Sequence, residues 1–128
     1  MNIRKVLYIE DYAPKYMAVY RYLEKYRFHI DRVTNAEDAV NRLENAIQHD
    51  APYDLLISDM HFDFFGTDDR AAGEKTLNLI REKGYTTPVI FCSSQNWDIP
   101  GSLGSIFFHP ERDWEFEADA LFRRIMAL

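Results

Sequence analysis

The chain has 128 residues, of which 47% are hydrophobic and 28% charged, and its formal net charge at pH 7 is −6. This length fits a single domain, residues 1–128, with a substantial hydrophobic core. The excess of acidic residues argues against nucleic-acid binding by the domain as a whole, because phosphate contacts need clustered Lys and Arg side chains.

Cysteine usage and apolar runs narrow the class of protein further. Cys92 is the only cysteine, so an internal disulfide and a four-cysteine metal site are both excluded. No apolar run approaches the roughly 20 residues needed to cross a bilayer, and the N-terminus lacks the apolar core of a signal peptide. We therefore expect a cytoplasmic protein that does not contact a membrane.

Strand-like apolar runs alternate with helix-like patterns along the whole chain. Each strand-like run is almost continuously apolar, which is typical of a parallel sheet covered by helices on both faces. In chain order we expect a strand at 5–11, a helix at 14–26, a strand at 28–34, a helix at 34–47, a strand at 53–59, a helix at 73–84, strands at 87–94 and 105–110, and a helix at 113–128. The second of these helices should begin with a capping box, since Thr34 and Glu37 have the required S/T-x-x-E spacing.

Polar side chains gather at the places where the predicted strands end. In an open parallel sheet the functional crevice lies at the carboxyl ends of the strands. The residues at these ends are Glu10, Asp11, Asp59, Ser93, Ser94 and His109. Each of them, taken alone, is explained by loop solvation or a turn, but their occurrence at corresponding strand ends favours a functional site.

Three carboxylates at one sheet edge repel one another unless a positive charge intervenes. A like-charge pair about 4 Å apart costs roughly 4 kcal/mol at an effective dielectric near 20. No Lys or Arg lies at a predicted strand end, so an oxygen-preferring divalent ion such as Mg²⁺ is expected there. A carboxylate beside such an ion can accept a phosphoryl group, and Ser93 and His109 would complete the surroundings of that group.

The order of the segments VLYIED, YDLLISDM, PVIFCSS and FFHP resembles the receiver domain of two-component response regulators, and the resemblance covers essentially the whole chain. It implies a flavodoxin-like (CheY-like) α/β fold with a five-stranded parallel sheet in the order 2-1-3-4-5. It also implies a stand-alone response regulator, rather than an enzyme, that accepts a phosphoryl group from a histidine kinase or phosphotransfer protein. Without an output domain of its own, it would signal through a downstream protein whose identity is unknown.

The resemblance implies a role for each residue of the site. Glu10 and Asp11 match the acidic pair that binds Mg²⁺, and Asp59 matches the phosphoacceptor. His61 stands where the family supplies a backbone carbonyl to the metal, and Ser93 stands where a hydroxyl bonds the phosphoryl group.

Two residues depart from the family pattern within the site itself. His109 replaces a lysine that precedes proline, and a histidine side chain is charged over a narrower pH range than a lysine. Arg112, three residues further on, is an alternative source of positive charge. Ile106 replaces an aromatic residue that takes part in switching in the family.

Two loops depart from the family pattern in length. The segment between the fourth and fifth predicted strands, SQNWDIPGSLG, is too short for a normal fourth helix, which we expect to be reduced or missing. The loop after Asp59 is longer than usual, at 62–72, and holds Phe62, Phe64 and Phe65. Two roles are possible for these phenylalanines. They form a surface that contacts a partner or covers the phosphorylation site, or they fold back to fill the gap in the core left by the missing helix.

Two other functions are compatible with parts of the pattern. The main alternative is a degenerate receiver that acts as a phosphorylation-independent interaction module, which the residues at positions 106 and 109 and the missing helix favour. An aspartate-nucleophile phosphatase is less favoured, because such enzymes carry an Asp-x-Asp strand end whereas Asp59 is followed by Met60 and His61.

Overall fold

A computed structural model describes all residues, 1–128, and its centre is a five-stranded parallel sheet. The order of the strands in this sheet is β2-β1-β3-β6-β7. The strands are β1 Lys5–Ile9, β2 His29–Val33, β3 Leu55–Ser58, β6 Val89–Ser93 and β7 Gly104–Phe107. Because β4 and β5 form a separate hairpin, this order is the predicted 2-1-3-4-5 of a flavodoxin-like fold, which is confirmed.

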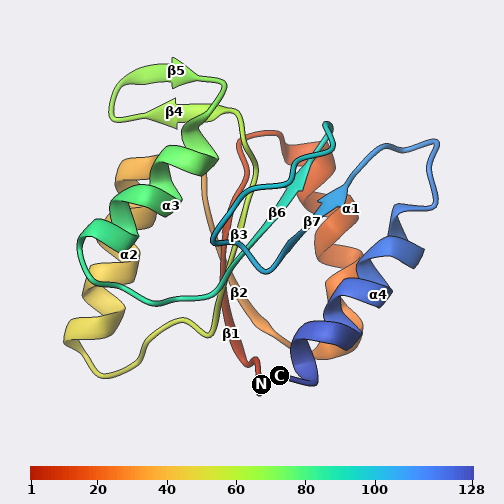
Figure 1. The fold of residues 1–128 in the computed structure, drawn as a ribbon, viewed down its shortest axis with the longest axis horizontal. Coiled ribbons are helices and arrows are strands. Elements are labelled where there is room, and N and C mark those ends of the chain that lie inside the picture. Colours follow the sequence, from red (N-terminus) through yellow and green to blue (C-terminus); the bar gives the residue numbers. More distant parts are fainter.

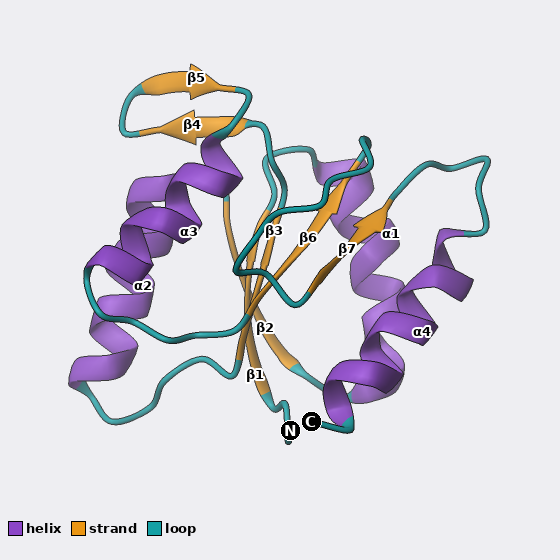
Figure 2. Ribbon diagram, viewed as in Figure 1, coloured by secondary structure: helices purple, strands orange, loops and turns teal.

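Helices cover both faces of this sheet (Figures 1 and 2). Helices α2 and α3 lie on one side, and α1 and α4 lie on the other. Their bounds are α1 Ala13–Leu23, α2 Ala36–Gln48, α3 Ala72–Glu82 and α4 Trp114–Met126, with a short 3₁₀ helix, η1 Glu24–Tyr26, after α1. None of these helices is long and apolar enough to span a membrane.

Strand alternation divides the hydrophobic core into two clusters, one on each face of the sheet. On β1, Leu7 and Ile9 belong to the cluster under α2 and α3, whereas Val6 and Tyr8 belong to the cluster under α1 and α4. All four side chains are fully buried. The sheet therefore has no solvent-facing side at its centre, and the polar ends of the strands are where function can be placed.

The start of α2 differs from the predicted capping box. Asn35, not Thr34, is the N-cap residue, and its side chain accepts a hydrogen bond from the backbone N–H of Asp38. Asparagine caps helices at least as well as threonine, so the first residue with the right backbone geometry takes the role. The helix is present as predicted, and only its cap is shifted by a residue.

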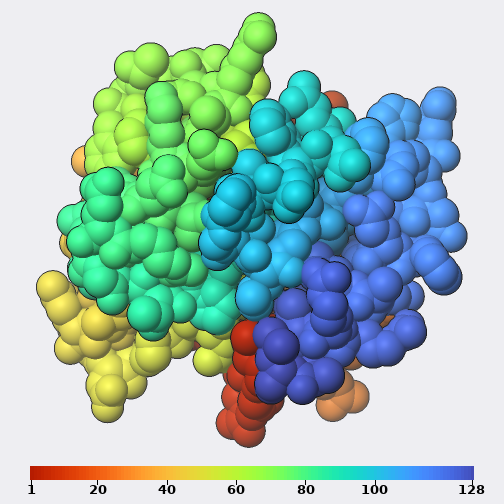
Figure 3. All heavy atoms as spheres, in the orientation of Figure 1, coloured from red at the N-terminus to blue at the C-terminus, as the bar shows by residue number.

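No helix forms between β6 and β7, as the shortness of this segment predicted. Residues 94–103 form a loop whose Ile99 is buried in the α2–α3 core cluster, with Trp97 packed against it. The atoms of this loop (cyan) lie between α3 (green) and α4 (dark blue) in Figure 3. Apolar side chains of the loop therefore cover part of the sheet that a helix would otherwise cover.

The long segment after Asp59 forms an antiparallel hairpin of β4 Phe62–Phe64 and β5 Thr67–Asp69. Its two turn residues have positive φ, 52° at Phe65 and 98° at Gly66, as tight hairpin turns require. Phe62 is fully buried in the α2–α3 core cluster, whereas Phe65 is 48% exposed. Phe62 folds into the core, but beside α2 and α3 and not in the place of the missing helix, and a contact role for the exposed Phe65 stays a prediction.

Phe62 should be the residue that anchors the hairpin to the domain. Phe62→Ala leaves a cavity in the core, so we expect it to lower the free energy of unfolding by about 3–5 kcal/mol in chemical denaturation. Phe65→Ala, which removes an exposed ring from the same hairpin, is the control and should change it by less than about 1 kcal/mol. Equal losses in the two variants would contradict this assignment.

Candidate functional site

A pocket of about 850 Å³ lies at the carboxyl ends of the central strands. It is lined by residues from the ends of β1, β3 and β6, from the β4–β5 hairpin and from the segment after β7. The residues that the sequence predicted for the site all line it: Glu10, Asp11, Asp59, His61, Ser93 and His109. The topology therefore brings together residues that are up to about a hundred positions apart in the chain.

The three acidic residues of the site form one cluster. Carboxylate oxygens of Glu10, Asp11 and Asp59 lie within 4.8 Å of one another. Glu10 is fully buried, Asp59 has 15% of its side chain exposed, and Asp11 is exposed. A set of oxygen ligands at this spacing is of the kind that hard divalent cations such as Mg²⁺ prefer.

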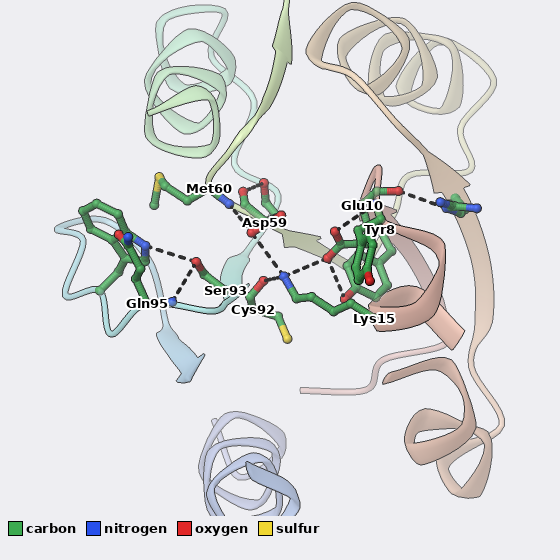
Figure 4. Close-up of polar contacts among 12 residues, drawn as sticks. Tyr8, Glu10, Lys15, Asp59, Met60, Cys92, Ser93 and Gln95 are labelled. Carbon is green, nitrogen blue, oxygen red and sulfur yellow. Dashed lines mark hydrogen bonds and ion pairs between the residues drawn. The ribbon is translucent and has the colours of Figure 1, made fainter. Parts of the chain in front are cut away.

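A lysine that the sequence did not predict lies inside this cluster. The Nζ of Lys15 is 2.8 Å from Oε1 of Glu10 and 3.1 Å from Oδ1 of Asp59. It also donates a hydrogen bond of 2.6 Å to the backbone carbonyl of Cys92, at the end of β6 (Figure 4). No Lys or Arg lies at a strand end, as predicted, but Lys15 reaches these carboxylates from α1, so a divalent ion is not the only source of positive charge there.

The sequence did not predict Lys15 as a site residue, because Lys15 does not lie at a strand end. It is the third residue of α1, and its side chain reaches back over the strand ends. The sequence does contain one local indication of this role. A cation in the first turn of a helix is repelled by the helix dipole, so a nearby negative charge is expected to stabilise it. The acidic pair Glu10 and Asp11, a few residues earlier in the sequence, supplies such negative charge.

Glu10 is held by several donors in a buried environment. The Tyr8 hydroxyl lies 3.4 Å from its Oε1, and the backbone N–H of Tyr12 lies 3.3 Å from its Oε2. Burial raises the pKa of Glu10 from its usual 4.5 to about 7, although the Lys15 ammonium opposes this rise and the Asp59 carboxylate adds to it. Burial also acts to lower the pKa of Lys15, but the negative charges around it outweigh this and raise the pKa of its ammonium.

The two oxygens of the Asp59 carboxylate differ in their contacts. Oδ1 accepts a hydrogen bond of 2.7 Å from the backbone N–H of Met60 and forms the ion pair with Lys15. Oδ2 has no hydrogen bond or ion pair within the protein. The carboxylate is therefore oriented through one oxygen, which leaves the other available to a ligand or reactant in the pocket.

Ser93 is buried beside a tryptophan whose role the sequence left open. Its Oγ accepts hydrogen bonds from Nε1 of Trp97 at 3.2 Å and from the backbone N–H of Gln95 at 3.3 Å. These contacts use the lone pairs of the hydroxyl and leave its hydrogen free to donate. Trp97, from the shortened loop, thereby fixes the position of a predicted site residue.

The histidines of the site lie at the rim of the pocket. His109 is exposed, and its Nδ1 accepts a hydrogen bond from the backbone N–H of Glu111. His61 directs its side chain to the hairpin, where Nε2 lies 2.9 Å from Oδ2 of Asp68. The use of the His61 backbone carbonyl as a metal ligand stays a prediction.

The residues close to His109 in the sequence contact α4, the hydrophobic core and the pocket wall. Arg112, the alternative cation of the sequence argument, bonds Glu117 on α4 and the backbone carbonyl of Phe107. Ile106 and Phe108 are both buried in the core cluster under α1 and α4. Phe108 also lines the pocket, with its ring centroid 6.0 Å from Nζ of Lys15. The positive charge nearest to Asp59 is therefore that of Lys15.

The raised pKa of Glu10 makes a prediction about the pH dependence of stability. A group whose pKa is raised on folding contributes stability that is present in full below its unfolded pKa and is lost as the pH rises through its folded pKa. For Glu10 this window runs from 4.5 to about 7 and corresponds to about 3 kcal/mol. Glu10→Gln, which is neutral throughout, should lose less unfolding free energy between these pH values than the wild type does.

Chemical denaturation at several pH values measures this difference. Glu82→Gln, an exposed glutamate of α3, is the control and should follow the wild-type curve. Parallel curves for Glu10→Gln and the wild type would contradict the prediction.

Comparison with known proteins identifies the fold but not a close relative. No protein-family model matches the sequence, and no curated protein sequence matches it either. Among solved structures, the signal receiver domain of an HD domain-containing protein from Pseudomonas fluorescens has a TM-score of 0.70 at 13% identity, covering 98% of this chain and 95% of that one.

Two other solved structures show the same likeness. The chemotaxis response regulator CheY4 of Vibrio cholerae has a TM-score of 0.65 at 17% identity, covering 94% of this chain and 98% of that one. The response regulator TrrA of Thermotoga maritima, solved in complex with Mg²⁺ and BeF, has a TM-score of 0.65 at 16% identity. The match covers 93% of this chain and 99% of that one. The chain therefore has the flavodoxin-like fold of response regulator receiver domains.

Proposed function

We propose that residues 1–128 form a single-domain response regulator that accepts a phosphoryl group on Asp59 and signals through protein partners. The observation that carries this proposal is the state of the Asp59 carboxylate. It lies in a pocket at the end of β3, oriented through Oδ1, with Oδ2 free of protein contacts. A carboxylate held in this way is prepared to act as a nucleophile.

The acidic cluster supports a role for Mg²⁺ in this chemistry. The carboxylates of Glu10, Asp11 and Asp59 have the oxygen ligands and the close spacing that the ion requires, so the residues present fit it. These three side chains, with the backbone carbonyl of His61, would hold the ion. A bound Mg²⁺ supplies positive charge that stabilises the transferring phosphoryl oxygens.

The proposed reaction is a transfer between a phosphohistidine and an aspartate. Oδ2 of Asp59 attacks the phosphorus, a P–O bond forms as the P–N bond breaks, and the imidazole of the donor leaves with a proton. Ser93 can donate its free hydroxyl hydrogen to a phosphoryl oxygen, and His109, at the rim of the same pocket, can add positive charge when protonated. Attack by water on phosphorus later breaks the acyl phosphate and restores the carboxylate.

The partners follow from this chemistry and from the surface of the fold. The donor would be a histidine kinase or phosphotransfer protein in the cytoplasm, and the output would pass to a downstream protein. The chain would act as a signalling domain whose only catalysis is its own phosphorylation and dephosphorylation. Because no helix lies between β6 and β7, the output surface would differ from that of receivers in which a fourth helix is present.

A phosphorylation-independent interaction module is the second candidate function. Two observations favour it. Lys15 already neutralises part of the acidic cluster, and His109 makes no contact with Asp59. In this alternative the acids and Lys15 would form a structural ion-pair network.

Beryllofluoride, which mimics a phosphoryl group, separates the two candidates. With Mg²⁺ present it should bind the wild type and change the fluorescence of Trp97, because the indole is bonded to Ser93. Asp59→Asn should abolish this response, since the acceptor oxygen is replaced. Asp50→Asn, at an exposed position after α2, should respond as the wild type does. No response in the wild type, or an unchanged response in Asp59→Asn, would refute phosphorylation at Asp59 and leave the interaction module.

A further inference from the structure

The ammonium group of Lys15 makes three close polar contacts inside the acidic cluster. The group has three N–H donors. It donates a hydrogen bond of 2.6 Å to the backbone carbonyl of Cys92 and forms ion pairs with Oε1 of Glu10 at 2.8 Å and with Oδ1 of Asp59 at 3.1 Å. Figure 4 shows the ammonium lying between the side chains of Glu10 and Asp59.

Without these contacts, the buried position of the Lys15 ammonium would be energetically unfavourable. Only 7% of the side chain is exposed, although lysine is almost never fully buried unless it is paired. It also lies in the first turn of α1, where the helix dipole repels a cation. The carboxylates of Glu10 and Asp59 therefore hold the ammonium in place, and it in turn neutralises them.

The ammonium and a divalent cation would need the same oxygens. Two of the three side chains in the acidic cluster, those of Glu10 and Asp59, already share their charge with Lys15. Asp11, the third, is exposed, and no ion pair joins it to Lys15. A metal ion at this cluster must therefore displace the ammonium or bind against its repulsion.

We propose that Lys15 is a tethered cation that competes with divalent metal for Glu10 and Asp59 and so sets the metal affinity of the site. This inference rests on the metal-binding part of the proposed function and does not require that phosphoryl transfer occurs. It assigns to α1 a control over metal occupancy that no residue at a strand end provides, since His109 makes no contact with the acidic cluster and Arg112 pairs with Glu117.

Metal titration of a charge-removal variant tests this competition. The probe is Mn²⁺, which takes the same carboxylate ligands as Mg²⁺ and whose free concentration is read from its EPR signal. Lys15→Met removes the charge but keeps most of the side-chain volume. We expect it to bind Mn²⁺ about tenfold more tightly than the wild type at about pH 8, and Mg²⁺ should displace the bound Mn²⁺.

Lys83→Met is the matched control. It removes one positive charge from a lysine that pairs with Glu44 between α2 and α3, outside the pocket, and should leave the Mn²⁺ affinity within about twofold of the wild type. Equal or weaker binding by Lys15→Met, or no binding by any of the three proteins, would overturn the proposal.

Thermal unfolding gives a second readout, which holds even if Lys15→Met is poorly stable without metal. Removal of the ammonium leaves Glu10 and Asp59 without their counter-ion, so Mg²⁺ should raise the melting temperature of Lys15→Met more than that of the wild type. An equal or smaller increase would count against competition. A failure of the proposed function is separate, because it would appear as absent beryllofluoride binding in a protein whose metal affinity still responds to Lys15.

Discussion

One buried ammonium group joins the ends of three neighbouring strands. Lys15 contacts Glu10 after β1, Asp59 after β3 and the Cys92 carbonyl on β6, so a side chain of α1 closes the edge at which the site lies. Without a cation, each close pair of carboxylates there costs roughly 4 kcal/mol at an effective dielectric near 20. A side chain of the chain itself therefore supplies positive charge that stabilises the acidic cluster without a metal.

The same contacts determine which atoms of the site remain available. Lys15 and the Met60 N–H occupy one oxygen of Asp59 and leave the other free. The Trp97 indole and the Gln95 backbone N–H occupy the lone pairs of the Ser93 hydroxyl and leave its hydrogen free. The pocket thus offers one free carboxylate oxygen and one free hydroxyl donor, and both are oriented by groups outside the predicted site. Its chemistry depends on these supporting residues as much as on the strand ends.

The strand order and the site residues at the strand ends could be predicted from the sequence. Parallel topology brings the residues that follow different strands to one edge of the sheet, whatever their separation in the chain. Lys15 was not predictable in this way, since its contact with Cys92 joins residues 77 positions apart and depends on where α1 packs. The cap of α2 was misplaced because Thr34 and Asn35 are both good caps, and only the backbone decides between them. The inward position of Phe62 likewise depends on a turn at Phe65 and Gly66 that apolar periodicity does not reveal.

The hairpin and the shortened loop lie on either side of Asp59, and they connect to it differently. The hairpin is joined to α2 and α3 through Phe62, which is fully buried in their core cluster. The loop that replaces a helix is joined to the pocket directly, because Trp97 bonds Ser93 while Ile99 is buried beneath it. A ligand that draws on the Ser93 hydroxyl therefore acts on a bond that holds this loop in place. In this fold α1 reaches Asp59 directly through Lys15, the covering loop reaches Ser93 through Trp97, and the hairpin, anchored in the core by Phe62, forms part of the pocket wall.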